Sequence, residues 1–414
     1  MRSVIWLVLL FVVAVVAALT LGDNDGLASF YWAGWRVDLS LNFFVLAAIA
    51  TGFAVVTAVH AINALIGLPA RAREWRALRL ERSAQAALRE ALAEYFGARY
   101  SRALKAAKRA ITLAPEVPTL ADDHEFHVLA SLLAAGSLHR LQDRPRRDEQ
   151  VGSALRAARH GAGAVVDDGA RLLAAEWALD DRDGPRAESL LAELQPGVAR
   201  RTQALRLKLG AARLERRPLE ALHTARLLAN HQAFSKAAAQ GLLRSLAIEA
   251  LDAPHDADQL RLAWLQFDNA DQRDPFVAAR AARRAAALGA AADGRAWLRP
   301  LWDRLDAMEA DGRAELAMAL VDTISGLGTD WLLRVESAQR AYPTEPAVQA
   351  AVGAALAERQ LWGKARPPLE QAANDLSLAP RARRQAWRTL ARLADEEGDA
   401  ARANACYRSA AAID

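Results

Sequence analysis

Two histidines in the stretch DDHEFHV have the residue types and close spacing of a metal-binding or haem-binding pair. His124 and His127 lie three residues apart, beside Asp122, Asp123 and Glu125. Positions three apart share a face of a helix, but the interval is one residue shorter than in the zinc-binding HExxH motif. A metal site also needs more ligands than this pair offers. The pattern favours the acidic start of a solvated helix and predicts no metal site.

Few other residues have side chains and spacings that could serve catalysis or ligand binding. His60 and Asn63 interrupt a long apolar run, where polar groups are candidates for function, although hydrogen bonding between two helices is the simpler interpretation. Cys406 is the only cysteine, so no disulfide within the chain and no multi-thiolate metal site can form. We interpret it as a core residue. The spacing indicates no Ser-His-Asp order, P-loop or pair of catalytic carboxylates, and we do not expect an enzyme.

The elements that carry these residues begin with two apolar runs. The first, Val4 to Leu21, has no charged residue and is about as long as a bilayer core requires. The second, Leu41 to Leu68, lacks Asp, Glu, Lys and Arg and can cross with a tilt. We predict two spans, about 4–21 and 41–66, joined by a short outer loop, 22–40. A cleaved signal peptide is the alternative for the first run, because Arg2 gives it a basic start.

Aromatic and basic residues flank these runs unequally. The loop contains Trp32 and Trp35, which are typical of a membrane–water interface, and a single arginine. Basic residues follow the second run immediately: Arg71, Arg73, Arg76, Arg79 and Arg82. Because basic flanks stay in the cytoplasm, both termini are predicted to be cytoplasmic, and attraction to anionic headgroups is a secondary role. An arm that grips nucleic acid is the alternative.

The overall charge argues against a nucleic-acid binder. The 53 basic residues are nearly balanced by 49 acidic ones, for a net charge of +4. Only five of the basic residues are lysine, and arginines recur along the whole chain beside many alanines. We interpret these arginines as biased residue usage on solvated helix faces, and we predict no nucleic-acid partner.

Beyond the basic segment the chain is rich in Ala, Leu, Arg and Glu, which predicts helices throughout. Small residues recur at intervals: 34 residues separate Ala187 from Ala221, and 38 separate Ala365 from Ala403. Ala103 occupies the corresponding place near the front. A period of 34 is that of the tetratricopeptide repeat, in which a small residue lets the two helices of a pair approach closely.

The period is imperfect. A step of 34 residues back from Ala365 reaches Trp331, which is not small, although Ala338 and Pro343 further along fit the same register. We predict an all-α chain with three parts: a two-helix membrane hairpin over 1–68, a basic juxtamembrane segment over 69–83, and a cytoplasmic tetratricopeptide-type α-solenoid over 84–414.

This combination resembles the HemY family of bacterial inner-membrane proteins. The resemblance rests on the loop sequence GWRVDLSL, on Trp75 within the Arg-rich segment, and on the first repeat, AALREALAEYFGARYSRALKAA. It implies location in the bacterial inner membrane and an association with late haem (protoporphyrin) biosynthesis, as a scaffold. The scarcity of lysine departs from what the family leads us to expect.

Three classes of function follow. We favour a membrane-tethered scaffold that binds other proteins, among them late haem-biosynthesis enzymes, on the concave face of its repeats. The alternative is a haem or porphyrin carrier, which would need an axial ligand such as His60, His124 or His127. An enzyme is the third class and the least supported. On the scaffold hypothesis the protein carries no cofactor.

Overall fold

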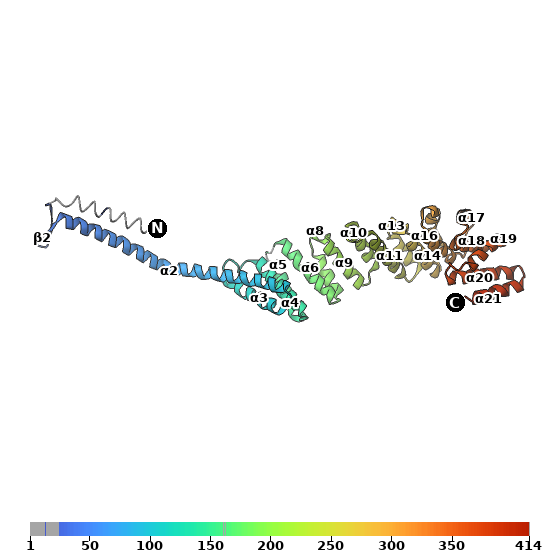
Figure 1. Cartoon of the computed structure of the whole chain (residues 1–414), viewed down its shortest axis with the longest axis horizontal. Coiled ribbons are helices and arrows are strands. Elements are labelled where there is room, and N and C mark those ends of the chain that lie inside the picture. Colours follow the sequence, from blue (N-terminus) through green and yellow to red (C-terminus); the bar gives the residue numbers. More distant parts are fainter. Residues whose placement is uncertain (1–12, 14–24, 160, 162, 414) are drawn as a thin grey trace. The chain divides into compact units, whose positions relative to one another are not determined.

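The computed structural model describes residues 13, 25–159, 161 and 163–413, with the side chains of 63–72 left aside. The described chain is almost wholly helical, as predicted (Figure 1). It divides into two compact units, Met1–Gln150 and Val151–Asp414, and each is described by itself. The predicted first span, 4–21, lies outside the described residues apart from Val13, which is helical.

The predicted outer loop contains a β-hairpin, the one departure from all-α structure among the described residues. Strands β1 (Leu27–Trp32) and β2 (Trp35–Ser40) pair antiparallel, with Trp32 opposite Trp35. The two-residue turn, Ala33 and Gly34, has positive φ at both positions, 45° and 85°. Such turns match the right-handed twist of paired strands. The predicted short outer loop, 22–40, thus contains paired strands, which the all-α prediction did not include.

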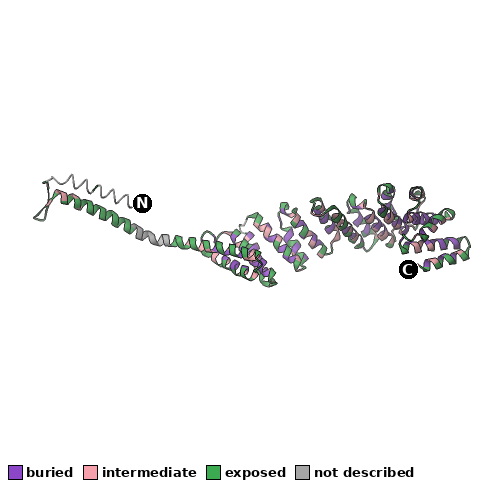
Figure 2. Ribbon diagram, viewed as in Figure 1, coloured by how far each residue is buried: buried purple, intermediate pink, exposed green. Residues whose placement is uncertain are grey.

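Helix α2 (Leu41–Phe96) follows directly and is 56 residues long. Its first part, Leu41–Ile62, is long and apolar enough to cross a membrane, and it is the one such segment in the described chain. None of it is buried in the structure, and most of it is exposed in Figure 2. The divisions predicted at 68 and 83 both fall inside α2, so the span and the basic segment share one continuous helix.

The first unit continues with helices packed onto the C-terminal part of α2. Ala84, Ala87 and Ala91 of α2 are fully or almost fully buried against the following helices. Those elements are α3 (Tyr100–Leu113), η1 (Ala114–Glu116) and α4 (His124–Arg140). Helix α5 (Arg144–Arg159) follows them and ends in the second unit.

The second unit is a series of antiparallel helix pairs. Five helices pack each against the next of the series, namely α11 (Lys236–Asp252), α14 (Pro275–Ala287), α16 (Ala310–Asp322), α18 (Pro346–Glu358) and α20 (Pro380–Glu396). Between them run α12 (Ala257–Leu265), α13 (Asn269–Gln272), α15 (Ala291–Trp302), η2 (Leu305–Ala307), η3 (Thr329–Trp331), α17 (Leu332–Ala341), α19 (Trp362–Asn374) and α21 (Ala400–Ala411). The unit opens with α6 (Ala164–Asp180), α7 (Gly184–Ala192), α8 (Pro196–Ala199), α9 (Thr202–Leu214) and α10 (Pro218–Asn230). One hydrophobic core runs from α9 to α21.

The five alanines predicted to let helices approach all occupy one structural position. Each is the fourth residue of the second helix of its pair and is buried: Ala103, Ala187, Ala221, Ala365 and Ala403. In the pair whose second helix is α17, this position belongs to Val335 and not to Trp331, which is buried one turn earlier in η3. The strict step of 34 residues was therefore wrong here, because the connections between helices differ in length.

Many of the arginines on the solvated helix faces also link neighbouring helix pairs. Ion pairs join arginines to carboxylates about one repeat away, at Arg217–Glu188, Arg244–Asp274, Arg261–Asp293, Arg280–Asp252, Arg283–Glu315, Arg313–Glu345, Arg334–Asp303, Arg366–Glu397 and Arg402–Glu370. Arg280 is bidentate, with N···O distances of 2.8 and 2.7 Å to Asp252. Lysine cannot reproduce this planar geometry.

Candidate functional site

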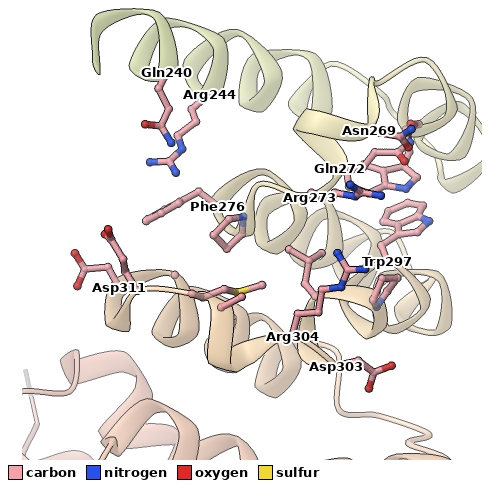
Figure 3. Close-up of a pocket in the computed structure, with 18 of the residues that line it drawn as sticks. Gln240, Arg244, Asn269, Gln272, Arg273, Phe276, Trp297, Asp303, Arg304 and Asp311 are labelled. Atoms are coloured by element: carbon pink, nitrogen blue, oxygen red, sulfur yellow. Dashed lines mark hydrogen bonds between the residues drawn. The ribbon is translucent and has the colours of Figure 1, made fainter. Parts of the chain in front are cut away.

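A recess of about 1040 Å³ lies in the second unit between α11 and α16. Its lining comes from three successive helix pairs, including α13, the start of α14 and the exposed face of α15. Figure 3 shows Arg244 and Phe276 toward one end, and Arg273, Arg304 and Trp297 toward the other. No residue of this recess was predicted as a site residue from the sequence.

The start of α14 positions the first end. Pro275 is the first helical residue, and the Asp274 carboxylate caps the helix by accepting from the backbone N–H groups of Phe276 and Val277, at 3.0 and 3.3 Å. Proline suits this place because its missing N–H would have no helical partner. Asp274 also accepts from Arg244 Nε at 2.7 Å, and the Arg244 guanidinium lies 4.2 Å from the centre of the Phe276 ring.

Stacked tryptophans build the other end. The indole of Trp297 lies against that of Trp264, with ring centres 5.0 Å apart and an interplanar angle of 26°. Trp264 is buried, whereas Trp297 is partly exposed to the recess. Pro300 lies inside α15 and has no N–H, so the Ala296 carbonyl at the recess lacks its usual helical donor. This end therefore offers an aromatic face beside a hydrogen-bond acceptor.

Arg273 and Arg304 supply positive charge to the recess. Both are exposed, both line the recess, and neither takes part in a side-chain hydrogen bond or ion pair of the described residues. Glu309 and Asp311 line the side formed by the start of α16, where a helix N-terminus stabilises negative charge. A binding partner that brings a carboxylate and a flat or apolar group would satisfy the two arginines and Trp297 together.

The histidines predicted as haem-ligand candidates do not lie in this recess. His124 begins α4 and His127 lies one turn further along, both in the first unit. Burial, reinforced by the neighbouring His124, lowers the pKa of His127 below its ordinary value. His60 is exposed on the apolar part of α2. Asn63 follows on the same helix, and its side chain is outside the described ones. The described residues contain no group of three or more His, Cys, Asp or Glu side chains that could hold a metal ion.

The residues predicted to set membrane topology lie on the hairpin and on α2. Trp32 and Trp35 flank the hairpin turn and are exposed. Four of the five arginines have described side chains, on one stretch of α2: Arg73, Arg76, Arg79 and Arg82. Arg79 lies over the Trp75 ring, 5.5 Å from its centre. Cys406 is buried in the core, which also raises the pKa of its thiol.

A sequence signal for the recess did exist. The stretches DNADQRDPF and WLRPLWDR combine aromatic residues, prolines and arginines within a few positions of helix ends. Their meaning depends on α13, α14 and α15 folding against one another, which the sequence spacing does not reveal.

Comparison with known proteins supports the resemblance found in the sequence. Residues 26–142 match the family described as the HemY protein N-terminus. The matched region covers the β-hairpin, α2, α3 and α4. No curated protein matches the chain. Residues 26–142 are therefore similar to the N-terminal region of the HemY family.

Proposed function

We propose that this chain is a membrane-anchored scaffold that binds partner proteins of late haem biosynthesis. In this proposal two spans hold the chain in the bacterial inner membrane, and both termini and the repeats lie in the cytoplasm. The helix pairs act as a tetratricopeptide-type solenoid, an architecture whose stacked repeats offer extended binding surfaces. The match of residues 26–142 to the HemY protein N-terminus supports a link to haem biosynthesis.

The recess between α11 and α16 is the observation that carries the proposal. It combines Trp297 and Phe276 with Arg273 and Arg304, which form no ion pair within the described chain. Buried aromatic anchors beside charge-assisted hydrogen bonds are the usual source of binding energy at protein interfaces. A partner segment would place an apolar side chain on the aromatic residues and a carboxylate on the arginines.

Site-specific photo-crosslinking in cells tests this proposal. We expect a benzophenone amino acid at Trp297 to capture late haem-biosynthesis enzymes, whereas the same probe at Leu227, which is exposed on α10 outside the recess, captures none. Arg273→Gln with Arg304→Gln should abolish the capture. The matched control is Arg206→Gln with Arg213→Gln, two exposed arginines of α9 that also lack ion pairs in the described chain.

Equal capture from both probe positions, or full capture by the Arg273/Arg304 double variant, would show that partners do not bind in the recess. Normal thermal melting of each variant is required in parallel, because an unfolded repeat would lose partners for an unrelated reason.

Porphyrin binding is the second candidate, and the same recess gives it support. Trp297 could stack on a flat macrocycle while Arg273 and Arg304 bind its carboxylates. The described lining has no histidine or cysteine, so haem ligation would fall to His60, His124 or His127 instead. Absorption titration with haem and with metal-free protoporphyrin separates these cases. Trp297→Ala should weaken binding in the recess, and His124→Ala with His127→Ala should weaken it at the histidines.

A further inference from the structure

The β-hairpin has two faces of opposite character. Side chains of paired strands alternate between the faces, so the residues on each face follow from the pairing. One face is wholly apolar and consists of Ala28, Phe30, Trp32, Trp35, Val37 and Leu39. The other face is mostly polar and consists of Leu27, Ser29, Tyr31, Arg36, Asp38 and Ser40.

The apolar face is increasingly uncovered toward the turn. At the end nearest α2, Ala28 and Leu39 are partly covered, and the Phe30 ring lies 5.3 Å from that of Phe44. At the turn, Trp32 is 85% exposed and Trp35 is 79% exposed. Side chains of this size are normally covered in a folded protein.

The polar face satisfies its own groups. The Asp38 carboxylate accepts hydrogen bonds from Ser29 Oγ across the strand pair and from Arg36 Nε at 3.0 Å. The Arg36 guanidinium also lies 5.7 Å from the centre of the Tyr31 ring. These contacts lower the pKa of Asp38 and keep it ionised in water. This face needs no partner other than solvent.

The hairpin is joined without a linker to the apolar end of α2. Strand β2 ends at Ser40, whose hydroxyl accepts from the Phe43 N–H at 3.4 Å to cap the helix, and the Leu41 N–H donates to the Gly26 carbonyl at 2.9 Å. The apolar segment has 22 residues. At 1.5 Å per residue it is about 33 Å long, close to the thickness of a bilayer core, so a spanning α2 places the hairpin at the membrane surface.

We infer that residues 26–40 form an interfacial membrane element, with Phe30, Trp32, Trp35 and Val37 inserted among the lipid headgroups around α2 and the polar face in water. The outer edges of a two-stranded sheet keep unpaired N–H and C=O groups that need water, so the hairpin stays at the interface and does not enter the hydrocarbon. Tryptophan favours that depth. The hairpin thus resists sliding of α2 into the membrane. This inference rests on the proposed spanning by α2 and not on the recess.

Cysteine scanning of the full chain in phosphatidylcholine–phosphatidylglycerol vesicles tests it. In a Cys406→Ala background, each of Phe30→Cys, Trp32→Cys, Trp35→Cys and Val37→Cys carries an environment-sensitive NBD fluorophore. We expect blue-shifted emission, at least twofold quenching by lipids with a nitroxide near the headgroup, and little quenching by iodide. The matched controls on the polar face, Ser29→Cys, Tyr31→Cys and Arg36→Cys, should show water-like emission and strong iodide quenching.

The pattern has a distinctive signature, because the protected positions are even-numbered in β1 and odd-numbered in β2. Iodide access at all positions overturns the inference. Protection from iodide on the apolar face without nitroxide quenching also overturns it, because protein would then cover that face, either the first apolar run or a second copy. Ile49→Cys on α2, labelled with the same fluorophore, is the reference for spanning. If a nitroxide deep in the bilayer fails to quench this fluorophore, α2 does not span the membrane. Both the membrane anchor of the proposed function and this inference would then be wrong.

Discussion

At the scale of single residues, a buried arginine of α15 caps the C-terminal end of α16. Arg295, on α15, donates to the carbonyl oxygens of Thr323, Ser325 at 2.6 Å and Gly326 at 3.1 Å, just beyond the end of α16. Glu358 of α18 accepts from the Gly326 N–H at 2.8 Å in the same turn. Positive charge at a helix C-terminus is stabilising. One side chain thereby replaces several missing backbone donors.

Loss of this side chain should be costly. We predict that Arg295→Met lowers the free energy of unfolding by roughly 2 to 4 kcal/mol, because it leaves three carbonyl groups without their donor. The matched control is Arg299→Met, one turn further along α15, where an exposed arginine lies 3.7 Å from Asp330 and a change within about 0.5 kcal/mol is expected. Urea unfolding followed by circular dichroism measures both. Similar losses for the two variants would contradict the assigned role.

At the scale of elements, close approach between the helices of each pair depends on small residues. Ala365 and Ala403 are buried at equivalent positions of α19 and α21. Across the first of these pairs, a Cβ added to Gly353 would lie 2.5 Å from Leu369. Helix contacts this short leave no room for a larger side chain.

Two alanines of α21 allow a direct test of this packing. Ala403→Phe should destabilise the C-terminal pair by about 1 to 3 kcal/mol, since it forces α21 away from α20. Ala401→Phe makes the same chemical change on an exposed position of the same helix and should be almost neutral. Hydrogen exchange of the full chain should show faster exchange over α20 and α21 in the first variant alone. Equal exchange in the two variants would show that Ala403 is not a close-approach position.

At the scale of the whole molecule, membrane orientation depends on charge. The arginines after the apolar segment of α2 outnumber the single arginine between the two apolar runs, and basic flanks remain in the cytoplasm. We predict that alkaline phosphatase fused after Gly26 is active and that the same enzyme fused after Arg82 or at the C-terminus is inactive. Activity of the C-terminal fusion would contradict the two-span topology.

The sequence by itself determined the features that depend on local composition. The apolar segment of α2, the helical character of the chain and the buried alanines were all predicted, because hydrophobicity and side-chain size act within a few turns of a helix. The HemY resemblance was confirmed over 26–142, since that match also depends on the residues of one continuous segment. The β-hairpin has a local signal as well, alternation on both sides of Ala33 and Gly34, which the interpretation as a loop overlooked.

Tertiary structure alone decided the rest. The recess joins Arg244, Arg273, Trp297 and Arg304 from separate helix pairs, and only the packing of α11, α14, α15 and α16 brings them together. Links such as Arg313–Glu345, 32 residues apart, likewise require neighbouring pairs to stack. Connections of unequal length change the sequence spacing from one helix pair to the next. No fixed period in the sequence could therefore predict which arginines form ion pairs and which, like Arg273 and Arg304, form none in the described chain.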